Sequence, residues 1–176
     1  MYMNEKLISD IKQIQNDYYS TSKKTFFNKK QLKTGCAELI TQNISLAELI
    51  SRTVSILQDT NKIIIDYTIF KTYSSSSNYG KIIESLISKI ISVIGTFGTF
   101  EIHLNLDSLT ITGLDKHQSV FQLYYDTCCT MGLSYNNNHI DKIVIYNTPM
   151  IIHTLIPIIV KYTDPSIKTK IQCVKK

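Results

Sequence analysis

Apolar residues recur at helical spacing through the first sixty residues of the chain. The first helix that this spacing predicts has one apolar face, made of Leu7, Ile8, Ile11 and Ile14. Two shorter helices are predicted further on, one around Leu39 and one that begins near Leu46. Ser45 and Glu48 have the spacing of a capping box, which makes Ser45 the predicted N-cap of the last helix. Residues 1–60 are therefore predicted to form a short helical N-terminal segment.

The hydrophobic pattern changes at Lys62 into an alternation of strands and helices. Runs of β-branched, aromatic or alternating apolar residues predict strands over residues 63–70, 100–106, 143–146 and 171–174. Helical spacing, broken after the first helix at Gly95, predicts helices over residues 79–94, 115–133 and 149–162. Thr148 is the predicted N-cap of the last helix, with Pro149 at its first position and a bend at Pro157.

This order of elements indicates an α/β fold. Right-handed crossovers between successive strands would give a mostly parallel β-sheet with helices packed on it, preceded by the short N-terminal helices. The continuous apolar run over residues 143–146 is typical of a strand that is covered on both faces. We therefore expect the sheet to occupy one domain over residues 61–176.

Length and charge narrow the possible functions. A chain of 176 residues with 43% hydrophobic and 19% charged residues is a single globular domain and not a disordered segment. Residues 21–35 contain five Lys and no acid, and residues 161–176 contain five Lys and one Asp, within a net charge of +5. Such basic stretches suit an anionic lipid headgroup or membrane surface, although a solvated face would have the same composition. Arg52 is the only Arg, which argues against nucleic acid as a partner.

The sequence contains no catalytic or metal-binding motif. There is no phosphate-binding glycine loop and no Gly-x-Ser-x-Gly turn, and the four His residues do not have metal-ligand spacing with one another or with Cys. Glu101 and His103 share the polar face of their strand and are an alternative acid–base pair, although such pairs also occur structurally. The four cysteines are expected to be free thiols in a reducing cytosol. We therefore expect neither an enzyme nor a cofactor, and neither a secretory signal nor a membrane helix.

The C-terminal third carries a recognisable succession of motifs. Residues 143–149, Ile-Val-Ile-Tyr-Asn-Thr-Pro, precede an apolar helix, which is followed by Asp164-Pro165 and by Lys170-Ile171. This succession resembles the CRAL-TRIO lipid-binding domain of phosphatidylinositol-transfer proteins, which reads strand, Asn-x-Pro, helix, a Leu-Asp-Pro-like turn and Lys-Ile. The resemblance covers about residues 60–174. It implies a sheet that forms the floor of an apolar lipid cavity.

The resemblance also implies a function and site residues. It implies binding and transfer of phospholipid by a cytoplasmic protein that associates peripherally with anionic membranes, with the bound lipid as ligand. Lys170 matches the Lys that contacts the headgroup in phosphoinositide-binding members, with Lys168 and Thr169 beside it. In those members an acidic residue pairs with this Lys. The corresponding position of this sequence falls near Asn138, so the ion pair is not reproduced. The residues expected to meet the acyl chains are Phe100, Ile102, Leu104, Phe121, Tyr124, Ile151, Ile152 and Leu155. Because Phe100 and Ile102 replace polar positions that meet phosphatidylcholine, an anionic phospholipid is the expected ligand.

Two further expectations concern partners. Members of the family continue beyond Lys-Ile into a strand and a helix that closes the cavity, whereas this sequence stops at Lys176. The N-terminal helices, a membrane or a second copy would then cover the apolar floor, and a homodimer is the preferred expectation. The same strand–helix alternation also resembles STAS-type regulators, so a non-catalytic protein-interaction module is the alternative function. A domain that acts only as a scaffold also stays open.

Overall fold

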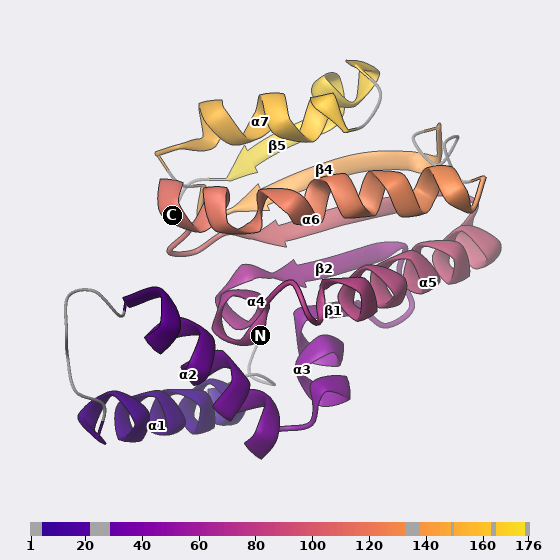
Figure 1. The fold of residues 1–176 in the computed structure, drawn as a ribbon. Helices are drawn as coiled ribbons and strands as arrows, with labels where there is room; N and C mark the ends of the chain where they lie inside the picture. Colours follow the sequence, from indigo (N-terminus) through magenta and orange to yellow (C-terminus); the bar gives the residue numbers. More distant parts are fainter. Residues whose placement is uncertain (1–4, 22–28, 133–137, 149, 163–164, 175–176) are drawn as a thin grey trace.

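A five-stranded sheet organises the computed structural model, which describes residues 5–21, 29–132, 138–148, 150–162 and 165–174. Its strands are, in order across the sheet, β1 (Val54–Ile56), β2 (Lys62–Asp66), β3 (Phe100–Asn105), β4 (Ile140–Tyr146) and β5 (Ile171–Val174). β1 is antiparallel to β2, and all other neighbours are parallel. The predicted α/β class with a mostly parallel sheet is confirmed (Figure 1).

The connecting helices cover one face of the sheet. α4 (Tyr67–Tyr73) and α5 (Tyr79–Phe97) join β2 to β3, α6 (Ile111–Thr130) joins β3 to β4, and α7 (Ile152–Lys161) with the 3₁₀ helix η4 (Pro165–Lys170) joins β4 to β5. Because consecutive strands are neighbours, right-handed crossovers place their helices on the same side. Figure 1 shows α5, α6 and α7 in one layer in front of the strands. No helix of the described residues is long and apolar enough to cross a membrane.

The strand register makes the face under these helices apolar. Ile63 of β2, Ile102 of β3 and Ile143 of β4 lie side by side, and the next inward row consists of Ile65, Leu104 and Ile145. The residues between them, such as Lys62 and Glu101, point to the opposite face because side chains alternate along a strand. The apolar face is therefore covered by the chain's own helices. The homodimer is not needed for that cover and stays a prediction.

The N-terminal helices pack beside the β1 edge of the sheet. They are α1 (Glu5–Thr21), α2 (Lys29–Asn43) and α3 (Leu46–Thr53), which confirms helices in this segment (Figure 1). The Ser45 hydroxyl accepts a hydrogen bond from the Glu48 backbone N–H at 3.2 Å, as the N-cap prediction requires. Leu7, Ile40 and Leu49 share one hydrophobic core with the sheet. The β1–β2 hairpin crosses residue 60, so backbone hydrogen bonds join the two predicted segments.

The predicted strand over residues 63–70 is wrong in its second half. β2 ends at Asp66, whose Oδ1 accepts hydrogen bonds from the Thr68 backbone N–H at 2.8 Å and from the Thr68 hydroxyl at 2.6 Å. These bonds cap the first turn of α4, so Ile69 and Phe70 lie in a helix and not in a strand. β1 was not predicted, because its three residues are too few to show a strand pattern.

Helix boundaries also differ from the predictions. α7 begins at Ile152 with Ile151 at the N-cap position, so Thr148 is not its N-cap. The Thr148 hydroxyl instead shares its proton between the carbonyls of Ile145 and Val174. Pro149 lies outside the described residues. α6 begins four residues before the predicted start, with Thr110 as its N-cap. α5 continues through Gly95 and ends at Phe97, followed by Gly98 as C-cap, whose φ of 78° suits glycine.

Asp66→Ala removes the cap of α4 and is expected to lower the free energy of unfolding by about 1–2 kcal/mol. Urea denaturation measures this change. Asp115→Ala, at an exposed position of α6, is the matched control and should change stability by less than about 0.5 kcal/mol. Equal effects of the two substitutions would contradict the capping role.

Candidate functional site

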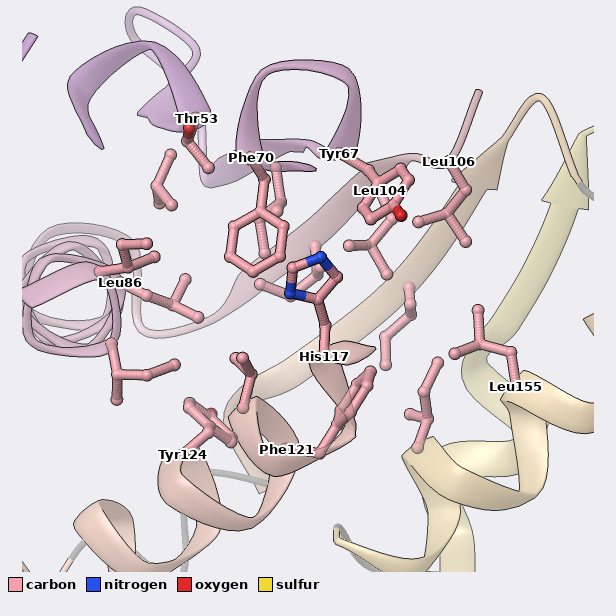
Figure 2. Close-up of a pocket in the computed structure, with 18 of the residues that line it drawn as sticks. Thr53, Tyr67, Phe70, Leu86, Leu104, Leu106, His117, Phe121, Tyr124 and Leu155 are labelled. Atoms are coloured by element: carbon pink, nitrogen blue, oxygen red, sulfur yellow. The ribbon is translucent and has the colours of Figure 1, made fainter. Parts of the chain in front are cut away.

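An apolar cavity of about 230 Å³ lies between the sheet and helices α4 to α7 (Figure 2). The sheet contributes Ile65, Phe100, Ile102, Leu104, Leu106, Ile140 and Ile143 to its lining. The helices contribute mostly aliphatic and aromatic side chains, among them Phe70, Leu86 and Leu155. The cavity exceeds the roughly 150 Å³ of an engineered protein cavity that binds benzene. It is therefore large enough for a small apolar molecule.

The burial pattern of β3 shows why space remains. Ile102 and Leu104 are in the middle of the sheet and point toward the helices, yet both are only half-buried. Phe100 on the same strand and Ile145 on the next are completely buried. In a filled core, residues at the centre of the sheet would be buried at least as well as those beside them. The helices therefore stand away from the sheet at Ile102 and Leu104.

Six of the eight residues that the sequence assigned to acyl-chain contact line this cavity. They are Phe100, Ile102, Leu104, Phe121, Tyr124 and Leu155. The other two, Ile151 and Ile152, lie at the start of α7, where they pack against the core without lining the cavity. Their contact with acyl chains stays a prediction.

An aromatic cluster closes the end of the cavity near α4. The His117 ring of α6 lies edge-on to Phe70, with ring centroids 4.8 Å apart, and to Tyr67 at 6.2 Å. Tyr79 stacks on Phe70, and its hydroxyl oxygen is 2.8 Å from His117 Nδ1. His117 is only 5% exposed. Figure 2 shows its ring projecting from α6 toward Phe70 and Tyr67.

Sequence reasoning did not select His117, because it searched for histidines with metal-ligand or catalytic spacing. A helical signal was nevertheless present. His117 precedes Phe121 by four residues and Tyr124 by seven, so the three side chains share the inner face of α6. A polar side chain on that inner face indicates a polar contact inside the protein.

The polar groups that line the cavity are uncharged near neutral pH. Burial, and to a smaller extent the nearby Lys116 ammonium, lower the pKa of His117 to about 4, so the imidazole is neutral. Burial raises the pKa of the phenols of Tyr67 and Tyr124 above its ordinary value. The cavity therefore suits an apolar molecule whose polar atoms carry no charge.

Aromatic residues also gather where α6 meets α7. The Tyr162 ring stacks on Phe121 with centroids 6.4 Å apart, and Tyr125 lies 6.2 Å away. Lys161 places its Nζ 5.1 Å from the centre of the Tyr162 ring. Tyr162 and Phe121 both line the cavity, so a cation lies beside its lining at this seam. The sequence did not assign Tyr162 or Lys161 to the site.

The predicted headgroup residues gather at the starts of β4 and β5. Lys170 Nζ donates a hydrogen bond to the Ile140 carbonyl at 2.5 Å, and Ile140 lines the cavity. The Thr169 hydroxyl donates to the Ser166 carbonyl at 2.8 Å. Lys168 and Asn138 are exposed. These residues lie outside the cavity lining, with Lys170 one contact away from it.

The alternative acid–base pair lies on the opposite face of the sheet. His103 Nε2 is 2.8 Å from Glu101 Oε2, and His103 Nδ1 is 2.9 Å from the Tyr146 hydroxyl. The predicted shared face of Glu101 and His103 is confirmed. The cavity lies on the other side of the sheet, so this network has no part in lining it. Among the described residues, no group of three or more His, Cys, Asp or Glu side chains is placed to hold a metal ion.

Comparison of the chain with protein-family models, curated proteins and solved structures found no match.

The buried His117 predicts a pH dependence of stability. The imidazole of the unfolded chain takes up a proton near pH 6.5, whereas the folded chain resists protonation until about pH 4. Acidification from about pH 7 to about pH 5 should therefore lower the free energy of unfolding by about 2 kcal/mol through this residue. Urea denaturation at both pH values measures the change in wild type and in His117→Phe, which lacks this contribution. His153→Gln, at an exposed position, should keep it. An unchanged pH dependence in His117→Phe would contradict the assignment.

Proposed function

We propose that this protein binds lipid without catalysing a reaction and carries it between membranes, with an acyl chain in the cavity between the sheet and α4 to α7. The observation that carries the proposal is the apolar space above Ile102 and Leu104 in the middle of the sheet. Burying an acyl chain there would contribute about 0.8 kcal/mol per CH₂ group. The six lining residues that the CRAL-TRIO resemblance also selects support the same proposal.

The size of the cavity favours one acyl chain. Ligand pockets usually measure roughly 300–1,000 Å³, and this cavity measures about 230 Å³. A phospholipid with two chains would place its second chain outside the cavity or separate α6 from α7. The stacked rings of Phe121 and Tyr162 join these two helices, so they are the contact that such an opening would break.

Basic residues at the end of α7 and in η4 favour an anionic headgroup. Lys161 lies on the Tyr162 ring, Lys170 is bonded to the Ile140 carbonyl, and Lys168 is exposed in η4 between them in the sequence. Each Lys near an anionic membrane surface contributes about 1 kcal/mol to attraction. We therefore propose peripheral association with an anionic leaflet and an anionic phospholipid, such as a phosphoinositide, with its headgroup near Lys170.

Mass spectrometry of the organic extract of the purified protein tests the proposal. We expect a co-purified lipid, or uptake of lipid from anionic liposomes. Leu104→Trp fills the centre of the cavity and should reduce uptake by at least about tenfold, because the indole occupies the space that the chain needs. Ile91→Trp, at an exposed position of α5, is the matched control and should leave uptake unchanged. Urea denaturation verifies that both variants fold.

Absence of lipid from the extract together with absence of uptake from liposomes would refute the proposed function. Equal uptake by wild type and a folded Leu104→Trp variant would show that the lipid binds outside the cavity.

Lys170→Ala is expected to reduce transfer of anionic phospholipid by about fivefold, which corresponds to the attraction of one Lys. It should lower stability by no more than about 1 kcal/mol, since it removes one hydrogen bond to the Ile140 carbonyl. A liposome transfer assay measures the first effect, with Lys81→Ala on exposed α5 surface as control. If Lys170→Ala unfolds the protein, Lys170 is structural and its headgroup role is wrong.

A second candidate function is a protein-interaction module, as the STAS resemblance suggests. The observation that favours it is the polar face of the sheet, where Glu101, His103 and Tyr146 form a hydrogen-bonded network opposite the cavity. A protein partner retained by wild type but lost on Tyr146→Ala, with unchanged lipid uptake, would support this function over lipid transfer.

A further inference from the structure

His117 is the one imidazole among the residues that line the cavity, and its two nitrogens have different surroundings. Nδ1 is 2.8 Å from the Tyr79 hydroxyl. Nε2 has no hydrogen-bond partner among the described residues, yet it is not among their buried polar atoms without a partner, so it meets open space although His117 as a whole is only 5% exposed. Since His117 lines the cavity, this nitrogen is available to a polar group that enters there.

The hydrogen bonds around His117 indicate which of its two ring nitrogens carries the proton when the ring is neutral. The Tyr79 hydroxyl has no partner other than His117 in the described part of the chain. If Nδ1 carried the proton and donated it to Tyr79, both the phenol proton and the Nε2 lone pair would be unsatisfied. If Tyr79 donates to Nδ1, the neutral imidazole carries its proton on Nε2, and only that N–H is unsatisfied. The second arrangement leaves fewer buried groups without partners and is the one we adopt.

The surroundings of His117 hold the ring in this orientation. Phe70 and Tyr67 lie edge-on to it from α4, while Tyr79 reaches Nδ1 from the start of α5. Figure 2 shows Nε2 on the side of the ring toward Phe70 and Tyr67. A Cβ atom on Gly113 would collide with the Tyr67 hydroxyl, so glycine at this position lets the Tyr67 phenol lie against α6. The Tyr67 phenol and the His117 imidazole, which each carry a polar hydrogen, therefore lie at the same end of the cavity.

We infer that the lipid chain inside the cavity carries one uncharged polar group, which accepts a hydrogen bond from His117 Nε2–H. The inference rests on the proposed function, because it requires an acyl chain in the cavity, and it adds the chemical class of the buried end. A hydroxyl, ester or ketone oxygen supplies the missing acceptor. A pure hydrocarbon leaves the N–H unsatisfied. A carboxylate would bury a charge beside a neutral ring, with no cationic side chain in the cavity lining to pair with it.

The buried acceptor is separate from the anionic headgroup that is proposed to lie near Lys170. A headgroup at Lys170 would stay outside the cavity, at the starts of β4 and β5. An acceptor at His117 lies inside, at the end formed by α4 and the first half of α6. The two sites can therefore be tested separately.

The test is a matched series of probes, decane, decanol, methyl decanoate and decanoate, which displace a fluorescent apolar dye from the full chain. Decanol and methyl decanoate are expected to bind about tenfold more tightly than decane, as one hydrogen bond to a buried donor predicts. Decanoate should bind more weakly than decanol. In His117→Phe the preference for decanol over decane should disappear, while the affinity for decane stays unchanged.

Nuclear magnetic resonance of the His117 imidazole nitrogens in the wild type gives a readout that needs no variant. Nε2 should carry the proton, and its resonance should move with decanol but not with decane. Tyr79→Phe removes the partner of Nδ1 and should produce a mixture of the two neutral tautomers, which tests Tyr79 as a positioning residue.

The outcomes separate the two proposals. If no probe displaces the dye, the proposed function fails and the inference fails with it. If decane binds as tightly as decanol, the cavity still takes a chain but the role of His117 is overturned. If decanoate binds most tightly, the uncharged class of the buried group is wrong. If Nδ1 carries the proton, Nε2 can only accept, and the inferred hydrogen bond from His117 to the ligand is overturned.

Discussion

The cavity depends on bulky aromatic rings that separate α4 and α6 from the sheet. Tyr67, Phe70 and Tyr79 pack around His117 at one end, and Phe121 stacks on Tyr162 at the other. Between these two clusters the strands present aliphatic side chains that are too short to reach the helices, which leaves Ile102 and Leu104 half-buried. Close packing is the normal state of a protein interior, so a space of this kind is maintained at a cost in stability. A bound apolar molecule would recover that cost by filling the space.

Charge and polarity are divided between the inside and the edge of the molecule. The cavity lining contains only neutral polar groups, of which burial keeps the imidazole of His117 uncharged. The ammonium groups of Lys161 and Lys170 lie outside the lining, against an aromatic ring and a backbone carbonyl. An amphiphilic ligand matches this division, because its chain and its charged group can each meet a suitable environment.

The order of strands and helices could be predicted from the sequence because the β3 alternation and the helical spacing of α5 and α6 are long and regular. The same alternation placed Phe100, Ile102 and Leu104 together on the cavity side. The ends of the strands and helices depend instead on local hydrogen bonds, which the pattern does not show. Asp66 ends β2 by capping a helix, and the hydroxyl of Thr148 bonds across to β5 instead of capping α7. The cavity could not be predicted, because periodicity shows which residues face inward but not whether they fill the space between them.

The most direct measurement of the central claim is a crystal structure of the protein under xenon pressure. Xenon enters apolar cavities that are open in the protein interior and identifies itself by its strong scattering. The account predicts xenon, or a retained molecule in its place, between Leu104, His117 and Leu155. A crystal structure in which the side chains of α6 pack directly on Ile102 and Leu104, with no space for xenon, would contradict it.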